Sequence, residues 1–266
     1  KDDEGAALLQ RACALAEPRD ERRLAALAHG NLAILHQRAG NNAEARAAYE
    51  RSLKAAEAAR DAATIALTRL NLAALARGEG DLASALSHLE ASVDMARRAG
   101  ATLALRGALL SLANLDLYLG RYARARGSIA SLASERASLP PVSQATLLGL
   151  EAELAARSGD ADGAAALYDR SAKAWTEQGR PHDAAEAKLE RLLLRARGGA
   201  ALGALTVELD ELERSLEPRG FGEHEALAQI VRGVLAVQRQ DDARARAAFD
   251  RAELESRRSG RREWEW

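Results

Sequence analysis

Apolar residues recur along most of this chain at intervals of three or four positions, which is the spacing that one face of an α-helix requires. Residues 31–53, NLAILHQRAGNNAEARAAYERSL, show the basic unit: a helix, a sharp turn at a glycine, and a second helix. Near-copies of this stretch follow, and their turn positions are Gly40, Gly80, Gly120, Gly159, Gly199 and Gln240. The pattern predicts helix pairs that repeat every 39 to 41 residues.

Four positions keep their character relative to each turn. A leucine stands five residues before it, at Leu35, Leu75, Leu115, Leu154, Leu194 and Leu235. An alanine stands five residues after it, at Ala45, Ala85, Ala125, Ala164, Ala204 and Ala245. Seven before the turn the residue is mostly small, at Ala33, Ala73, Ala113, Ala152, Leu192 and Gly233. Nine after it the residue is large and apolar except once, at Tyr49, Leu89, Ile129, Tyr168, Glu208 and Phe249.

These positions have a direct physical interpretation. Glycine adopts the left-handed conformation that ends a helix at little cost. Small residues let two antiparallel helix backbones approach closely, and the large residue then fills the space toward the next pair. No single pair buries its apolar face alone, so repeats of this kind stack into a solenoid. The fifth copy is the most divergent, because Arg191 and Glu208 stand where apolar residues are expected. A softer joint or a contact outside the array is predicted there.

We expect an unpaired helix over residues 3–16, followed by six helix pairs that end near residue 258. The half repeat covers residues 1–17, and the predicted repeats lie near 20–60, 61–99, 101–137, 142–178, 181–217 and 223–259, with a tail at 260–266. Four aspartates stand where they are expected to cap the helix that follows, namely Asp20, Asp61, Asp81 and Asp160. The SLPPVS loop at 138–143 is the clearest interruption, because Pro140 and Pro141 do not fit inside a helix.

The combination of a small residue, a turn glycine, an alanine five later and a Tyr or Phe nine later resembles the tetratricopeptide repeat. That resemblance covers nearly the whole chain and implies an all-α, right-handed superhelical solenoid of about 13 helices. Two features depart from it: the period is near 40 residues instead of 34, and the usual proline after the second helix is mostly missing. Long repeats that start with Asn-Leu-Ala resemble the kinesin-light-chain-like and bacterial-regulator arrays. The chain starts in the second helix of a repeat, so we expect a single array that is a piece of a longer protein.

Composition narrows the class of partner. The 266 residues carry a formal net charge of −1, so no overall positive field attracts nucleic acid or an anionic membrane. No apolar run is long enough to span a membrane, and a cytoplasmic location is expected. The one cysteine, Cys13, lies in an apolar helical stripe, and a buried, inert thiol is expected there, with a redox or ligand role as the alternative.

No motif for catalysis is present in the sequence. The glycine-rich GEGD at 78–81 joins two helices and does not follow a strand, so a phosphate loop is not indicated. His29 and His36 share a helix face, but no third or fourth metal ligand accompanies them. We therefore expect no enzyme, no cofactor and no metal.

The resemblance places the first helix of each pair on the concave groove of the solenoid. Its inward positions in this chain would be Asn31, Ile34, Arg38, Asn71, Ala74, Arg77, Gly78, Ser111, Asn114, Tyr118, Leu150, Glu153, Arg157, Glu190, Leu193, Arg197, Val231, Val234 and Gln238. Asn31 and Asn71 share one register, and in related repeats an asparagine there binds the backbone of a peptide. A helix–helix hydrogen bond is the alternative. Arg38, Arg77, Arg157 and Arg197 would form a basic strip for carboxylates, or else they favour helix C-termini through the helix dipole.

The expected function is a protein- or peptide-binding scaffold, as the interaction or sensory region of a larger bacterial signalling protein, with an acidic segment as partner. The first alternative is self-association by end-to-end or edge packing, through the termini or through Trp264 and Trp266. Docking of these two rings on the last helix, or their place in a truncated helix, is the other interpretation. A small-molecule-sensing array is a further alternative. It needs an aromatic-lined pocket, and aromatic residues are 3% of the chain.

Overall fold

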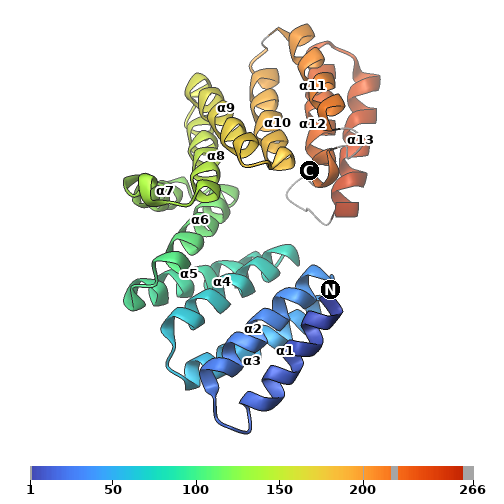
Figure 1. The fold of residues 1–266 in the computed structure, drawn as a ribbon. Coiled ribbons are helices and arrows are strands. Elements are labelled where there is room, and N and C mark those ends of the chain that lie inside the picture. Colours follow the sequence, from blue (N-terminus) through green and yellow to red (C-terminus); the bar gives the residue numbers. More distant parts are fainter. Residues whose placement is uncertain (1, 200, 217–220, 260–266) are drawn as a thin grey trace. The chain divides into compact units, whose positions relative to one another are not determined.

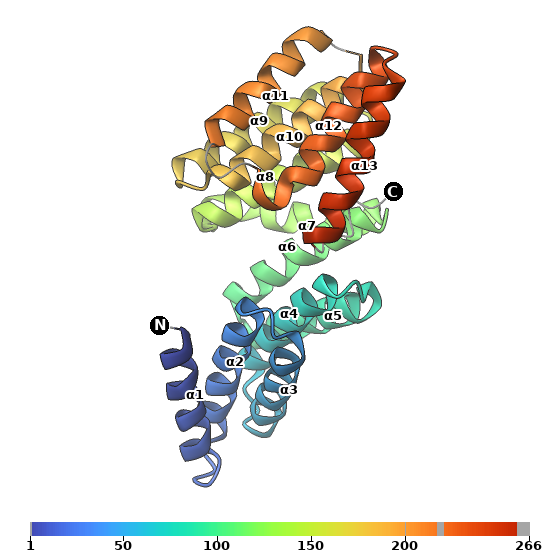
Figure 2. The ribbon, with the colours of Figure 1, turned by 90° about the vertical axis from the view of Figure 1, so that its right-hand side faces the viewer.

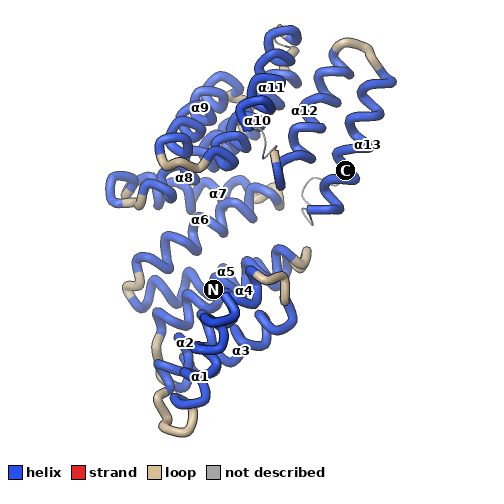
Figure 3. Tube along the Cα trace, turned by 45° about the vertical axis from the view of Figure 1, so that its right-hand side comes forward, coloured by secondary structure: helices blue, strands red, loops and turns tan. Residues whose placement is uncertain are grey.

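In the computed structural model, all regular structure among the described residues, 2–199, 201–216 and 221–259, is helical (Figures 1 and 3). The α-helices of this part are α1 (Asp2–Ala16), α2 (Arg22–Arg38), α3 (Asn42–Ala58), α4 (Ala62–Gly78), α5 (Leu82–Ala99), α6 (Thr102–Tyr118), α7 (Tyr122–Ser134), α8 (Pro141–Arg157), α9 (Ala161–Glu177), α10 (Pro181–Arg197), α11 (Leu202–Leu216), α12 (Glu225–Gln238) and α13 (Asp242–Ser259). Short 3₁₀ turns are η1 (Arg136–Ser138) and η2 (Gly222–His224). The predicted all-α class and helix order are confirmed.

The chain divides into two compact units, Lys1–Leu112 and Ala113–Trp266, with the boundary inside α6. In the first unit α2 pairs with α3 and α4 pairs with α5, while α1 packs on α2. In the second unit α8 pairs with α9, α10 contacts α9, α11 and α12, and α12 pairs with α13 (Figure 2). Each unit therefore consists of antiparallel helix pairs stacked on their neighbours in sequence.

All six predicted turn positions adopt the left-handed conformation, and the φ angles range from 61° at Gln240 to 86° at Gly159. The same hydrogen bond closes the turns at Gly40, Gly80, Gly120, Gly159 and Gln240. At the first turn the Asn41 N–H donates to the His36 carbonyl over 2.9 Å, and at the second Asp81 donates to Ala76 over the same distance. This is the Schellman arrangement, which satisfies carbonyls that a helix end leaves without a partner. The turn prediction is thus confirmed, including at Gln240, where no glycine stands.

The positions that keep their character from repeat to repeat form the contacts between helices. Ala33 and Ala45 are fully buried where α2 crosses α3, and the ring of Tyr49 packs against Leu72 and Leu75 of α4. The Tyr49 hydroxyl donates to Gln37 Oε1 of α2 over 2.9 Å, so the polar end of the ring is satisfied. Packing of this kind joins one pair to the next, which is what a solenoid repeat needs.

A buried serine strengthens three of the pairs. The hydroxyls of Ser52, Ser92 and Ser171 donate to the carbonyls of Ala26, Ala66 and Ala145 over 2.7, 2.7 and 3.0 Å. Each bond spans 26 residues and joins the second helix of a pair to the first. A buried hydroxyl without a partner would be costly, so these bonds fix the relative position of the two helices.

The fifth pair departs from the predicted register by one residue. In the other pairs the second helix begins two residues after the left-handed turn residue, whereas α11 begins at Leu202, three residues after Gly199. Leu205 and Leu209 therefore occupy the buried positions, and Ala204 is exposed. The prediction that Ala204 and Glu208 occupy the packing positions five and nine residues after the turn is wrong for this reason.

The two charged residues of this pair bind each other. The Arg191 guanidinium on α10 is buried; it forms an ion pair with Glu208 of α11, and its Nε lies 2.9 Å from Asp169 Oδ1 of α9. Arg191 thus links three helices, and two carboxylates, those of Asp169 and Glu208, contact its guanidinium group. Instead of a softer joint, the structure shows an ion-paired one at these residues.

Aspartate caps are confirmed at three of the four predicted positions. Asp61, Asp81 and Asp160 accept hydrogen bonds from the backbone N–H groups of Thr64, Ser84 and Gly163. Asp20 is the exception, because it adopts a left-handed φ of 56° and precedes the N-cap residue of α2. Its carboxylate instead binds the Arg22 side chain at 2.6 Å, so the cap prediction for Asp20 is wrong. The prolines also behave differently from the prediction, since Pro141 is the first residue of α8, where a missing N–H costs nothing.

Candidate binding surfaces

The predicted residues of the first unit lie along one stripe on each first helix. On α2, Asn31 and Arg38 are exposed and Ile34 is half-buried; on α4, Asn71 is half-buried and Arg77 is exposed. Ala74 and Gly78, between and beyond them on α4, are exposed as well. This set is called the first-helix face of α2 and α4. Ile34 packs against the core of α2, α3 and α4, whereas Asn31 and Arg38 reach the surface.

Two leucines that the sequence did not single out belong to the same face. Leu27 precedes Asn31 by one helical turn and is 45% exposed; Leu67 precedes Asn71 by one turn and is 43% exposed. Both stand thirteen residues before their turn, a position that holds Gly107, Thr146, Glu186 and Leu227 in the other repeats. That variability was the available signal, because a position required for packing would keep its character. The face therefore combines apolar, amide and cationic groups.

The second unit has a different surface. Glu153 and Arg157 on α8 and Glu190 and Arg197 on α10 are the predicted positions, and each arginine accompanies a carboxylate. Arg157 Nη2 lies 3.5 Å from Glu153 Oε1. The first-helix face of α8 and α10 is accordingly mixed in charge, and the expected basic strip is not found there.

Burial controls the protonation of this mixed cluster. Burial, reinforced by the charges of Glu153 and Glu186, raises the pKa of Glu190 to about 8. Burial also raises the pKa of Glu153, although Arg157 opposes the shift. The pKa of the Tyr168 hydroxyl is raised by burial and by the nearby Glu190 and Glu153. All three shifts favour the protonated form, because partial burial disfavours a charge and the neighbouring carboxylates repel a further negative charge.

Three other predicted positions do not reach the surface. Leu150, Leu193 and Val231 are buried, and the last two belong to the large apolar core of α10 to α13. Their assignment to the groove is wrong, because these side chains pack between neighbouring helices. Val234 and Ser111 are half-buried, and Gln238 is exposed. On α6, Asn114 is half-buried and Tyr118 is half exposed.

Cys13 takes part in an unexpected arrangement. Its Sγ lies 3.4 Å from Nδ1 of His29, and His29 Nε2 lies 2.9 Å from Glu17 Oε1. Thiol, imidazole and carboxylate in this order are the groups of a cysteine nucleophile. Burial and the charge of Glu17, however, raise the pKa of the Cys13 thiol, and both Cys13 and His29 are buried. A thiol that holds its proton in this way is a poor nucleophile, and the contacts instead attach α1 to α2.

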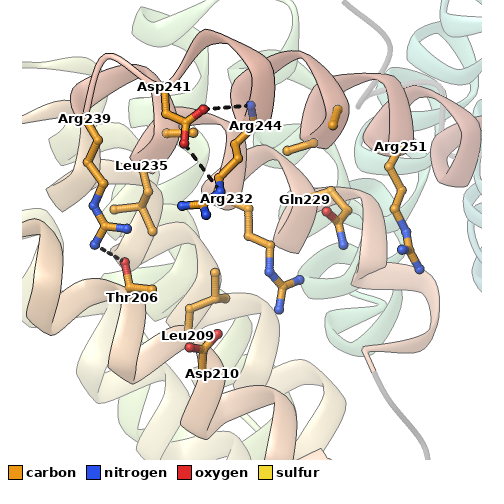
Figure 4. Close-up of a pocket in the computed structure, with 13 residues that line it drawn as sticks. Thr206, Leu209, Asp210, Gln229, Arg232, Leu235, Arg239, Asp241, Arg244 and Arg251 are labelled. Carbon is orange, nitrogen blue, oxygen red and sulfur yellow. Dashed lines mark hydrogen bonds and ion pairs between the residues drawn. The ribbon is translucent and has the colours of Figure 1, made fainter.

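The structure also shows a pocket that sequence reasoning missed. It has a volume of about 420 Å³ and lies between α11, α12 and α13 (Figure 4). Four arginines line it, and none of the predicted groove residues does: Arg232, Arg239, Arg244 and Arg251. Leu209, Leu235, Ala236, Ala247 and Ala248 supply its apolar surface. No sequence motif marks it, since the pocket depends on how the three helices meet.

The described residues show neither a metal site nor a helix that spans a membrane. Within residues 2–199, 201–216 and 221–259, no group of three or more His, Cys, Asp or Glu side chains is arranged to hold a metal ion. In the same part of the chain, no helix has both the length and the apolar character needed to cross a membrane. The two tryptophans of the tail, Trp264 and Trp266, lie outside the described residues.

Comparison with known proteins supports the fold. No model of a protein family matches the sequence, and no curated protein sequence matches it. A tetratricopeptide repeat protein from Parabacteroides merdae is similar in structure, with a TM-score of 0.61 and 16% identity over 94% of this chain and 93% of that one. A Rap protein, solved in complex with Competence and Sporulation Factor, has a TM-score of 0.69 and 13% identity over 88% of this chain and 65% of that one. The chain therefore has a tetratricopeptide-like helical-repeat fold.

Proposed function

We propose that this chain is a protein-interaction scaffold that binds a segment of another protein on the first-helix face of α2 and α4. The observation that carries the proposal is the repeated pair of an exposed leucine and, one turn later, an asparagine: Leu27 with Asn31, and Leu67 with Asn71. Large exposed apolar side chains in register on adjacent repeats are typical of interaction surfaces.

The chemistry of the face indicates which segment it would bind. An asparagine amide offers both a donor and an acceptor, so it matches the backbone of an extended segment whatever its sequence. Leu27 and Leu67 would contact apolar side chains of that segment. Arg38 and Arg77, near the C-terminal ends of α2 and α4, favour a segment that carries carboxylates. The Rap protein of similar fold, which is known in a complex with Competence and Sporulation Factor, is consistent with such a role for this fold.

The finer role proposed for the scaffold is that of an interaction or sensory region in bacterial signalling. This part rests on the resemblance of the long repeats to regulator arrays, and a scaffold without catalytic activity is proposed with it. A fold of this kind also serves unrelated functions. The proposal therefore depends on the exposed residues of α2 and α4 and not on the fold alone.

Selection of peptides from a displayed random library tests the proposal. We expect peptides that combine apolar and acidic residues to be enriched. Substitution of both Asn31→Ala and Asn71→Ala should weaken their binding by about tenfold or more, because two backbone hydrogen bonds are lost. Asn42→Ala, at an exposed asparagine that begins α3, is the matched control and should leave the affinity unchanged. Failure to enrich any peptide, or equal binding by the double variant, would contradict the proposal.

A further inference from the structure

The pocket between α11, α12 and α13 has a regular construction. Arg232 of α12 and Arg239, the residue directly after this helix, are seven residues apart, with Leu235 and Ala236 between them. On α13, Arg244 and Arg251 are also seven apart, with Ala247 and Ala248 between them. Seven residues are two helical turns, so the members of each set share one face of their helix. Each helix thus presents an apolar strip with a guanidinium at either end.

Antiparallel pairing brings the two strips together. Because α12 and α13 run in opposite directions, Arg232 lies toward the same end as Arg251, and Arg239 toward the same end as Arg244 (Figure 4). The leucine and alanine side chains form the floor between the two ends, and Leu209 of α11 adds to it. The lining contains four arginines against two aspartates, Asp210 and Asp241, so it is positive.

The two ends of the pocket differ in how many contacts their arginines make with other groups of the protein. At one end Arg239 donates to Thr206 Oγ1 over 2.7 Å and to the Leu202 carbonyl over 3.0 Å, and Arg244 Nε lies 3.4 Å from Asp241. At the other end Arg232 pairs with the partly exposed Glu213. Arg251 is exposed, and among the described residues it has neither an ion pair nor a hydrogen bond. The Arg232–Arg251 end is therefore the one with capacity for a further anion.

One buried polar side chain also lines the pocket. Gln229 lies between Arg232 and Arg251 in Figure 4, and its side-chain amide donates to Glu225 over 2.8 Å.

We propose that this pocket binds a small amphipathic organic anion, whose carboxylate, sulfonate or phosphate lies between Arg232 and Arg251 and whose apolar part covers Ala236, Ala247 and Ala248. Guanidinium groups bind such anions through paired, charge-assisted hydrogen bonds. The volume of about 420 Å³ lies within the range of small-molecule pockets. No lining residue is aromatic, so the apolar surface of the pocket is aliphatic and binds the apolar part of a ligand by non-directional contact.

The pocket is independent of the first-helix face of α2 and α4, which lies in the other unit. Anion binding would survive if the peptide-binding proposal failed, and the reverse also holds. The chemistry requires only an anionic group on an apolar body. A free organic acid supplies that chemistry, and so does an acidic side chain next to an apolar one in a protein segment.

The test uses anilinonaphthalene sulfonate, a fluorescent anion with an apolar body, added to the folded full chain. We expect saturable binding that weakens by about fivefold or more in Arg232→Gln and in Arg251→Gln. Asp210→Asn should strengthen it, because a repelling carboxylate is removed. Arg246→Gln, at an exposed arginine of α13 outside the lining, is the matched control and should change nothing. Circular dichroism verifies that each variant keeps its helicity.

Competition then identifies the source of the anion. Displacement of the dye by hexanoate but not by hexanamide supports a free organic acid, and displacement only by an acetylated Ala-Glu-Leu-Ala amide peptide supports a protein segment. Equal displacement by hexanoate and hexanamide would overturn the proposal, since the arginines would then play no part. Non-saturable dye binding, or unchanged binding in both Arg232→Gln and Arg251→Gln, would overturn it as well.

Discussion

Glu190 shows how a single residue links the helix packing of the second unit to its stability. It is half-buried on α10, near Glu153 on α8 and one turn from Glu186 on its own helix. The raised pKa of Glu190 has a thermodynamic consequence. A carboxyl whose pKa is higher in the folded state than in the unfolded state binds its proton more tightly when the protein is folded. Its contribution to stability is complete below pH about 4.5 and is lost as the pH rises toward about 8.

Replacement of this carboxyl should therefore remove much of that pH dependence. We expect the melting temperature of the native chain to fall between pH about 5 and about 8, and Glu190→Gln to flatten the fall and raise the melting temperature at pH about 8. Thermal unfolding, followed by circular dichroism at several pH values, measures this dependence of the melting temperature on pH. The groups that face Glu190 stay in place in this variant, namely Glu153, Glu186, Arg157, Arg197 and Tyr168.

Glu211→Gln is the control for this measurement, because Glu211 is exposed on α11 of the same unit. That variant should follow the native chain over the whole pH range. A Glu190→Gln protein whose melting temperature still fell as steeply as the native one would show that Glu190 does not retain its proton at neutral pH.

At the scale of single helices, the register of α11 is the main difference between prediction and structure. The sequence places Ala45 and Ala204 in one column, but the longer turn after Gly199 moves Leu205 into the buried position and leaves Ala204 exposed. The leucines of α11, at 202, 205, 209, 212 and 216, recur at helical spacing on the face that the structure buries, whereas the predicted register put Ala204 and Glu208 there. The spacing of these leucines was therefore the signal for the shifted register.

A matched pair of substitutions distinguishes the two registers. Ala45→Leu should destabilise the protein by about 1–3 kcal/mol, since the side chain is fully buried between α2 and α3 and has no room to grow. Ala204→Leu, the same change in the same sequence column, should alter stability by no more than about 0.5 kcal/mol. Chemical denaturation measures both. A large destabilisation by Ala204→Leu would show that α11 keeps the register of the other repeats.

The ion pair between Arg191 and Glu208 gives a second example at this scale. Each of these two charged residues stands at a position where the other repeats have an apolar residue. Considered one at a time, they predict less stable packing between the helices of the fifth pair. The structure brings the two side chains together and adds Asp169 of α9. A pairing between side chains from three helices depends on tertiary geometry, which one sequence without an alignment does not contain.

For the molecule as a whole, the sequence was sufficient for the helices, the turns and the fold. Six left-handed turn residues and the buried alanines follow from local rules, since each depends on residues close in sequence. The candidate sites were predictable only in part. Asn31, Asn71, Arg38 and Arg77 lie at or near the surface as expected, because the helical period assigns them to one face.

The remaining features required the paired helices. The exposed leucines of α2 and α4 look like core residues in the sequence, and the arginine-lined pocket combines strips of α12 and α13 that meet only after folding. The register of the tetratricopeptide repeat, applied to this sequence, predicts that Leu150, Leu193 and Val231 line the groove. The structure shows instead that all three are buried. A register inferred from a resemblance identifies the helix and approximate face, but packing decides which of the neighbouring side chains is exposed.

The central claim is that a protein segment binds on the first-helix face of α2 and α4, and backbone amide chemical shifts measured by NMR on the full chain test it most directly. Titration with a library-selected peptide should shift the amide signals around Leu27, Asn31, Leu67 and Asn71, and leave those of α3 and α5 nearly unchanged. Shifts confined to α3 and α5, or spread evenly over the chain, would contradict the assignment of this face as the binding surface.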